Sequence, residues 1–196
     1  MEKINFIKTF IPEGQYRQKY EYGGMVVYHI NAEYNNEMNA YECYECTMSK
    51  ATFDETKVRS AFAQFSAKLD ALKLEEAKAE KIAEITAYDT SSSVNGFMLN
   101  GLLVWLDKAT RVGLMNSTTI AKAAGQKTTT LWLGGIKLVV DCDKAIQLLS
   151  ALEMYALECF NVTASHKQAV SELTTIEEVE AYDYKAGYPK MLEMSV

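Results

Sequence analysis

ITAYDTSSSVNGFMLNG (residues 85–101) opens the stretch of sequence that decides the fold of this chain. The stretch continues with VWLDKATRVGLMNS (104–117), TTTLWLGG (128–135), DKAIQLLSALEMYALECFNVTASHKQAV (143–170) and ELTTIEEVEAYDYKAGYP (172–189). Two pairs of turn residues interrupt its apolar runs: Asn100-Gly101 and Gly134-Gly135. Asparagine and glycine adopt the positive φ angles that tight hairpin turns require. The pattern therefore predicts two β-hairpins.

Two helices of this stretch have clear start signals. Asp107 is placed to cap a helix that ends near Gly125, a typical C-terminal glycine. Two alternatives stay open for this helix: a continuous one, or two pieces divided at Gly113 or at the polar run that follows it. Thr175 and Glu178 form a capping box that opens the last helix.

A third helix begins after the second hairpin. Asp141 or Asp143 is placed to cap it, and its apolar pattern continues through Phe160. The apolar arc is too wide for a surface helix, so we expect this helix at the centre of the core. The polar segment after Phe160 predicts a break, and Thr163 then opens another helix.

The order of these motifs, over about residues 85–190, resembles a domain of unknown function common in tailed phages and prophages, including those of Bacteroides-type gut bacteria. In those phages the domain often lies at the C-terminus of tail, fibre or fibre-assembly proteins. The resemblance implies a structural setting and names no reaction. Six residues belong to the motifs that carry this resemblance, and we expect them to maintain the fold rather than to catalyse: Trp105, Asp107, Arg111, Trp132, Tyr155 and Tyr182. Asp107 and Arg111, four residues apart, are also spaced to pair across one helical turn.

The first 50 residues are rich in strand-forming side chains. GMVVYHI (24–30) and AYECYECTM (40–48) carry β-branched and aromatic residues, and the polar segment 31–39 connects them. A shorter strand over residues 4–11 precedes a loop at Pro12 and Gly14. An antiparallel hairpin or meander is the expected result.

A long helix over residues 54–88 follows, and TFDE (52–55) matches a capping box at its start. Its apolar positions alternate steps of four and three, the spacing of a coiled-coil seam, and the pattern weakens at Glu76 and Ala79. Two interpretations stay open: a helix packed on its own domain, or a helix shared between subunits. The seam positions are Val58, Phe62, Phe65, Leu69 and Leu72.

These elements predict an α+β fold in three segments. Residues 1–51 form a small antiparallel β-rich region for attachment or oligomerisation, and residues 52–88 form a long connecting helix. Residues 89–196 form a C-terminal module with about four helices and two β-hairpins.

Composition narrows the function classes. The chain has 196 residues, of which 48% are apolar, and a net charge of −6. It has no basic cluster of the kind that binds nucleic acid. Its apolar runs are far shorter than the roughly 20 residues that span a bilayer. The N-terminus lacks the apolar core of a signal peptide, so we expect synthesis in the host bacterial cytoplasm and no membrane partner.

The side chains that usually carry chemistry are sparse. His29 and His166 are the only histidines, and a Cys159–His166 dyad is not expected because the predicted helix break separates the two. Cys43 and Cys46 form a lone CxxC in a predicted strand, where an odd separation places the thiols on opposite faces. We predict no catalytic residue, no cofactor and no metal site.

Tyrosine is the residue type that points to a partner. Seven of the twelve tyrosines lie between residues 16 and 44. Either they cover the sheet and the long helix, or they form an interface with another subunit or virion protein. The candidate interface residues are Tyr16, Tyr20, Tyr22, Tyr28, Tyr34, Tyr41, Tyr44, Phe62, Phe65 and Leu69.

The functional hypothesis is a non-enzymatic structural component of a tailed-phage virion, in a fibre, tail or head appendage. It would act by forming a dimer or trimer and by docking to other virion proteins. One alternative is a tail or fibre assembly chaperone that is absent from the mature virion. A minor alternative is an enzyme that degrades host surface polymers, which would normally carry paired carboxylates in a cleft.

Overall fold

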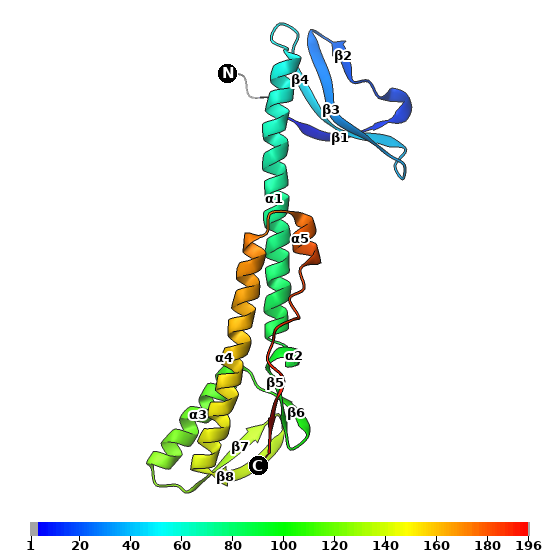
Figure 1. Ribbon diagram of the computed structural model, residues 1–196. Helices are drawn as coiled ribbons and strands as arrows, with labels where there is room; N and C mark the ends of the chain where they lie inside the picture. The colour runs from blue at the N-terminus through cyan, green and yellow to red at the C-terminus, as the bar shows by residue number, and fades with distance from the viewer. Residues whose placement is uncertain (1–3, 196) are drawn as a thin grey trace. The chain divides into compact units, whose positions relative to one another are not determined.

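The computed structural model describes residues 4–195 and has the predicted α+β fold, with an N-terminal antiparallel sheet, a long helix and C-terminal helices (Figure 1). The chain forms two compact units, Met1–Lys73 and Leu74–Val196. The long helix α1 (Glu55–Asp89) contributes residues to both units. The segment predicted as one connecting helix is therefore shared between them.

The first unit contains a four-stranded antiparallel sheet with the strand order β1-β4-β3-β2. A short 3₁₀ helix, η1, follows the first strand. Strand β2, an edge strand, is not among the elements that the sequence predicts. The elements are β1 (Ile7–Pro12), η1 (Glu13–Gln15), β2 (Lys19–Tyr22), β3 (Met25–Asn35) and β4 (Ala40–Ser49).

Strand β3 extends beyond its predicted end. The expected connection over residues 31–39 is wrong in its first half, because pairing with β4 resumes after a register shift between Ile30 and Glu33. Asn31 adopts a positive φ of 55° at this irregularity. Asparagine tolerates that conformation better than most residues, so a polar residue here makes a bulge and does not end the strand.

The start of α1 differs from the predicted capping box. Asp54 caps the helix, because its carboxylate accepts hydrogen bonds from the backbone amides of Thr56 and Lys57. Thr52 instead bonds the Ser49 carbonyl in the turn after β4. A carboxylate directly before the first helical residue is a better placed cap than a threonine two residues earlier.

The core of the first unit lies between one face of the sheet and the first part of α1. Tyr28 and Cys46 of the sheet pack with Val58 and Phe62 of the helix. These two seam positions are buried within the unit, which favours a helix packed on its own domain at this end. Leu72, the last seam position, is exposed.

The second unit contains both predicted hairpins. Asn100 and Gly101 both have positive φ in the first turn, and Gly134 and Gly135 both have positive φ in the second. The strands are β5 (Gly96–Leu99) with β6 (Leu102–Trp105), and β7 (Thr128–Leu133) with β8 (Ile136–Asp141). Strand β9 (Leu192–Met194) pairs in parallel with β5, so it is the third strand of the sheet that contains β5 and β6; the sequence does not predict it.

The helices of the second unit are more continuous than the sequence predicts. These are α2 (Ser92–Asn95), α3 (Lys108–Ala123), α4 (Cys142–Glu172) and α5 (Ile176–Ala181). Helix α3 runs through Gly113 without a division, and Asp107 and Asp141 cap α3 and α4. The predicted break after Phe160 is wrong. Thr163 lies inside α4, where its hydroxyl bonds Asp89 and Tyr188, so it joins the helix to other segments and opens no new helix.

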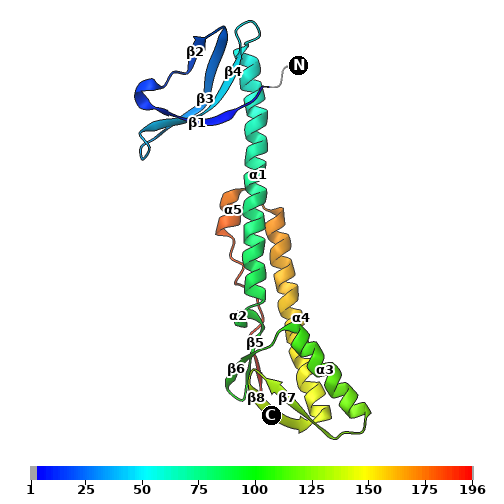
Figure 2. The same ribbon diagram turned by 180° about the vertical axis from the view of Figure 1, so that it is seen from behind.

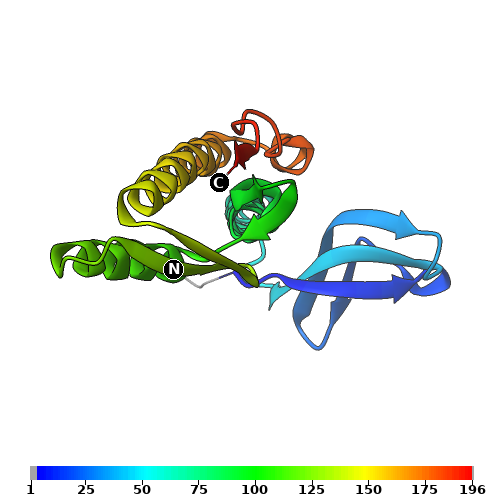
Figure 3. The ribbon, with the colours of Figure 1, turned by 90° about the horizontal axis from the view of Figure 1, so that it is seen from below.

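Two hydrophobic clusters hold the second unit together. The larger one lies where the hairpins meet α4 and includes Phe97, Leu131 and Leu149. The smaller one joins Ile85 of α1 and Val170 of α4 to α5. Figures 1 and 2 show the end of α1 beside α4 and α5, and Figure 3 shows α4 and α5 on the same side of α1. Within residues 4–195, no helix is long and apolar enough to cross a membrane.

Candidate functional site

The candidate interface tyrosines divide between the two faces of the N-terminal sheet. Tyr28 belongs to the core beneath α1, and successive side chains of a strand point to opposite faces, so His29 points away from the helix. Tyr20 pairs with Val27, and Tyr34 pairs with Tyr41, which places all three tyrosines on the same face as His29. This face lies opposite α1.

Four tyrosines and one histidine form a continuous cluster there, which we call the aromatic face: Tyr16, Tyr20, His29, Tyr34 and Tyr41. Tyr16 stacks on Tyr41 with ring centroids 4.3 Å apart, and Tyr34 meets the edge of Tyr41 at 5.2 Å. The rings of Tyr16 and Tyr20 lie 5.9 and 6.0 Å from His29. Tyr20 and Tyr34 remain exposed. The cluster thus presents aromatic surface to solvent on a rigid sheet.

His29 supports the aromatic face from below and is itself only 3% exposed. Its Nδ1 atom faces the Arg17 carbonyl oxygen, and its Nε2 atom lies 3.3 Å from a carboxylate oxygen of Glu45. One ring nitrogen thus faces a backbone carbonyl and the other faces a carboxylate. His29 therefore ties the segment before β2 onto the sheet.

Of the other candidate interface residues, all but Tyr22 lie on the helix side of the sheet or on α1. Tyr28 is 1% exposed, and its hydroxyl donates to Glu55 at 3.1 Å, which leaves it no surface for a partner. The Tyr44 ring packs against Phe62 and Phe65. Leu69 is half-buried on α1. The remaining candidate, Tyr22, is 80% exposed at the end of β2.

In the second unit, four of the six residues that we expect to maintain the fold form hydrogen bonds that cap a helix or join elements: Asp107, Arg111, Tyr155 and Tyr182. The Asp107 carboxylate accepts from the Thr110 amide at 2.8 Å, so it caps α3. The side chains of Asp107 and Arg111 do not pair across the helical turn, although their spacing allows it. Both carboxylate oxygens bond Thr110, and the Arg111 side chain instead binds Glu153 at 2.9 Å and the Leu106 carbonyl at 2.8 Å.

The two tyrosines among these six residues, Tyr155 and Tyr182, form hydrogen bonds with other segments of the second unit. The Tyr155 hydroxyl donates to the Val94 carbonyl at 2.7 Å, and burial raises the pKa of Tyr155. The Tyr182 hydroxyl lies 2.9 Å from Nδ1 of His166. His166 is half-buried and uses its other nitrogen on the Ala186 carbonyl, so it does not pair with Cys159. The two tryptophans, Trp105 and Trp132, are exposed.

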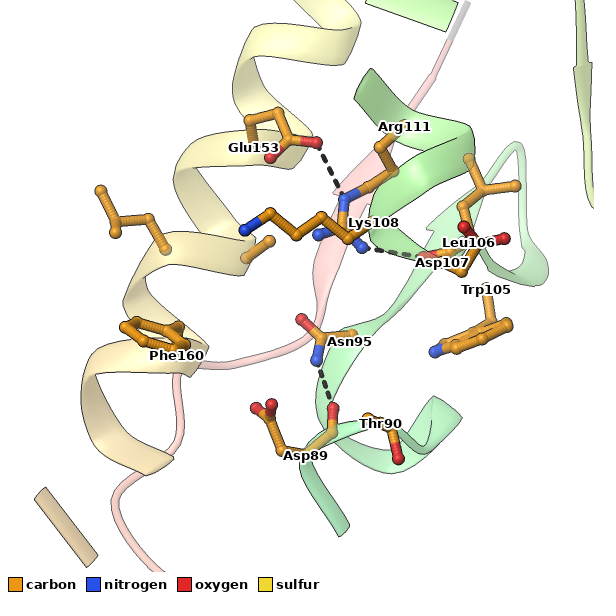
Figure 4. Close-up of a pocket in the computed structure, with 12 residues that line it drawn as sticks. Asp89, Thr90, Asn95, Trp105, Leu106, Asp107, Lys108, Arg111, Glu153 and Phe160 are labelled. Atoms are coloured by element: carbon orange, nitrogen blue, oxygen red, sulfur yellow. Dashed lines mark hydrogen bonds and ion pairs between the residues drawn. The ribbon is translucent and has the colours of Figure 1, made fainter. Parts of the chain in front are cut away.

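A pocket of about 560 Å³ opens beside the Arg111–Glu153 ion pair, between α3, α4 and the end of α1 (Figure 4). The rings of Trp105 and Phe160 lie on opposite sides of it, and Lys108 extends from α3 toward α4. Trp105 is 40% exposed and Phe160 is 60% exposed. The position of Phe160 corrects the expectation for α4, whose wide apolar arc is exposed along one face at Met154, Leu157 and Phe160.

The acidic side chains around this pocket already have partners. Asp107 bonds Thr110, Asp89 accepts from Thr163 at 2.7 Å, and Glu153 pairs with Arg111. The Lys108 ammonium makes no hydrogen bond or ion pair within residues 4–195. The pocket therefore offers apolar rings and one positive charge without an ion-pair partner among residues 4–195, which suits the binding of an apolar group and a negative charge.

The cysteines belong to the interior. Cys43, Cys46, Cys142 and Cys159 are all buried as free thiols. Cys46 packs toward α1, whereas Cys43 lies near Tyr16, as the predicted opposite orientation requires. Burial raises the pKa of both thiols, which disfavours the reactive thiolate. Among the described residues, no group of three or more His, Cys, Asp or Glu side chains is placed to hold a metal ion.

Comparison with known proteins identifies one family. Residues 76–186, more than half of the chain, match the domain of unknown function DUF4376. No curated protein and no solved structure matches the chain. The match covers Arg111 and Tyr155, which hold elements of the second unit together, and Trp105, which lines the pocket. The chain therefore belongs to the DUF4376 family of domains of unknown function.

Proposed function

We propose that this protein is a non-enzymatic structural component of a tailed-phage virion, in a fibre, tail or head appendage. It acts by self-association and by docking to other virion proteins. The observation that carries the proposal is the aromatic face, because exposed tyrosines on a rigid sheet are characteristic of protein interfaces. The phage setting comes from the motif resemblance in residues 85–190.

The use of the polar side chains supports a structural role. The histidines bond backbone carbonyls, Asp107 caps a helix, and Arg111 joins α3 to α4. These are the residue types that catalytic sites employ, and here their hydrogen-bonding atoms are directed at the chain itself. The family domain then supplies a stable body, and the sheet unit supplies attachment.

The pocket beside Arg111 gives the family domain a docking place of its own. Its rings and the Lys108 ammonium suit a protein segment that carries an apolar and an acidic side chain. In this scheme the protein is synthesised in the host bacterial cytoplasm and ends in the virion, with itself and other virion proteins as partners.

Quantitative mass spectrometry of purified virions and of the infected-cell lysate tests the proposal. We expect the protein in virions at a fixed ratio to a major structural protein. Abundance in the lysate together with absence from virions would overturn the proposal and identify an assembly chaperone. Depolymerising activity of the purified protein on host surface polysaccharides would contradict the non-enzymatic role.

A further inference from the structure

Strand β2 is an edge strand of the N-terminal sheet, with a neighbouring strand on one side only. It is the last strand in the order β1-β4-β3-β2, and within residues 4–195 only β3 pairs with it. All four of its residues, Lys19 to Tyr22, are exposed. An exposed edge has free backbone amides and carbonyls that can extend the sheet with another strand.

The hydrogen bonding of β2 to β3 shows which backbone groups point outward. The His29 amide donates to the Gln18 carbonyl at 2.9 Å, so Gln18 and His29 form a hydrogen-bonded pair. Hydrogen-bonded pairs alternate along antiparallel strands, so Tyr20 with Val27 is the next such pair. The amides and carbonyls of Lys19 and Glu21 therefore point away from β3, toward the free edge.

We infer that a second copy of this chain pairs with β2, antiparallel, about a two-fold axis that passes beside Tyr20. In this register, Lys19 of each copy lies opposite Glu21 of the other, and these are the residues whose backbone groups are free. The pairing joins two four-stranded sheets into one. The inference rests on the self-association in the proposed function and gives it a surface, a register and a number of subunits.

Charge favours this register over its neighbours. Within its own chain, Glu21 pairs with Lys50 at 2.6 Å and the Lys19 ammonium lies 5.3 Å from the centre of the Phe53 ring, and both side chains remain exposed. Lys19 opposite Glu21 of the second copy brings further unlike charges together twice in the dimer, which stabilises cross-strand pairs. A shift of the axis to Lys19 or to Glu21 would place two identical charges opposite each other, which destabilises the pairing. A shift by one residue would direct the free amides toward Tyr20 and Tyr22, whose backbone groups already face β3.

The other edge of the sheet lacks these properties. Lys8 is the only charged residue of β1, so a second copy of β1 has no carboxylate to place opposite it. Pro12, at the end of β1, has no amide to donate. A lone lysine on an edge opposes pairing, whereas the lysine and glutamate of β2 complement a second copy of themselves.

The inferred pairing also extends the aromatic face. Tyr20 of one copy lies directly opposite Tyr20 of the second copy, on the side of the sheet where Tyr16 and Tyr41 stack. A two-fold pairing of identical edges is closed, because each copy uses its only β2 edge. Of the predicted dimer and trimer, the structure therefore favours the dimer.

Cysteine cross-linking of the full chain tests the register. In Tyr20→Cys, the two Cα atoms face each other at about 4.5 Å, within the range of a disulfide. We expect a disulfide-linked dimer under mild oxidation, visible on non-reducing gels and abolished by reductant. The four native cysteines are buried and provide no competing exposed thiol.

Tyr22→Cys is the matched control, because Tyr22 is also exposed and also lies on β2. In the inferred register its Cα atom is separated from its counterpart by four residues, about 13 Å, too far for a disulfide. We expect no cross-link at dilute concentration. Equal cross-linking of Tyr20→Cys and Tyr22→Cys, or none in Tyr20→Cys, would overturn the inferred pairing.

A proline test probes the outward amide directly. Glu21→Pro removes an amide that β3 does not use, whereas Glu21→Ala removes the same carboxylate and keeps the amide. Because Glu21→Pro removes two hydrogen bonds per dimer, we expect the dimer dissociation constant to rise about tenfold over that of Glu21→Ala. Circular dichroism checks that both variants keep the fold, and sedimentation equilibrium measures the constants.

The outcomes separate this inference from the proposed function. A wild-type dimer that is insensitive to Glu21→Pro would leave self-association standing and reject the β2 edge. A wild-type monomer at high concentration would reject the inference and the self-association on which it rests. Whether the protein belongs to the virion is decided separately, by its presence in purified particles.

Discussion

Asp107 is a residue whose ionised form stabilises the fold although its side chain is exposed. Its carboxylate accepts hydrogen bonds from the Thr110 hydroxyl at 2.6 Å and the Thr110 amide at 2.8 Å. These bonds hold the pKa of Asp107 below its ordinary value of 3.8. Because the folded-state pKa is lowered, the stabilisation is present above pH 3.8 and is lost as the pH falls through the folded-state pKa.

Two substitutions of Asp107 separate capping from charge. Asp107→Ala removes the cap and should lower the melting temperature by about 3 °C at pH 7. Asp107→Asn keeps a capping oxygen that does not titrate, so its deficit relative to the wild type should shrink as the pH falls below about 4. Thermal melts followed by circular dichroism from pH 7 to pH 3 measure both. A constant deficit of Asp107→Asn over this range would contradict the charge effect.

Helix α4 is an element whose stability depends on a buried hydroxyl in its middle. Thr163 is buried, donates to Asp89 at 2.7 Å, and lies 3.0 Å from the Tyr188 hydroxyl. Thr163→Val keeps the shape and removes both bonds, so we expect a loss of about 1–2 kcal/mol in the free energy of unfolding. Urea denaturation measures it. The control is Thr119→Val on α3, where an exposed hydroxyl bonds its own helix and little change is expected; equal losses would contradict this role.

The two hairpin turns and the Asp107 cap, which have local signals, were predicted correctly, whereas elements that depend on distant partners were not. The Asn100-Gly101 turn makes its hairpin with adjacent residues, and Asp107 caps the helix that follows it. Strand β9 pairs with β5, which is almost 100 residues earlier in the chain, and its three residues carry no strand pattern. The sequence alone predicts a helix start at Thr163, because the hydrogen-bond partner Asp89 is 74 residues away and leaves no local signal.

The candidate site shows the same limit. Trp105 and Arg111 belong to the motifs that the sequence analysis singles out. The ion-pair partner of Arg111 is Glu153 on helix α4, and the sequence does not predict this pair. Phe160 and Lys108 were missed as pocket residues. The signal for Phe160 is the wide apolar arc of α4, which by itself predicts a helix at the centre of the core. In the structure the excess width is the exposed wall of the pocket.

At the scale of the whole molecule, the chain has separate hydrophobic cores. The core that contains Val58 and Phe62 draws its residues from the first unit alone. The cores around Leu149 and Val170 draw theirs from the second unit alone. A unit that buries its own core can unfold as its own cooperative step. The continuous helix α1 does not by itself merge two cores, because most helical stability comes from packing.

Calorimetry of the full chain should therefore show two unfolding transitions. Phe62→Ala removes a ring that packs against Phe6 and Tyr44, and Leu149→Ala opens a cavity in the second unit. Each should cost about 3 kcal/mol, so each should lower one transition by several degrees and leave the other in place. The two variants serve as controls for each other. A single transition that both substitutions lower equally would mean that the cores unfold together, and the first unit could then not act as an independent attachment module.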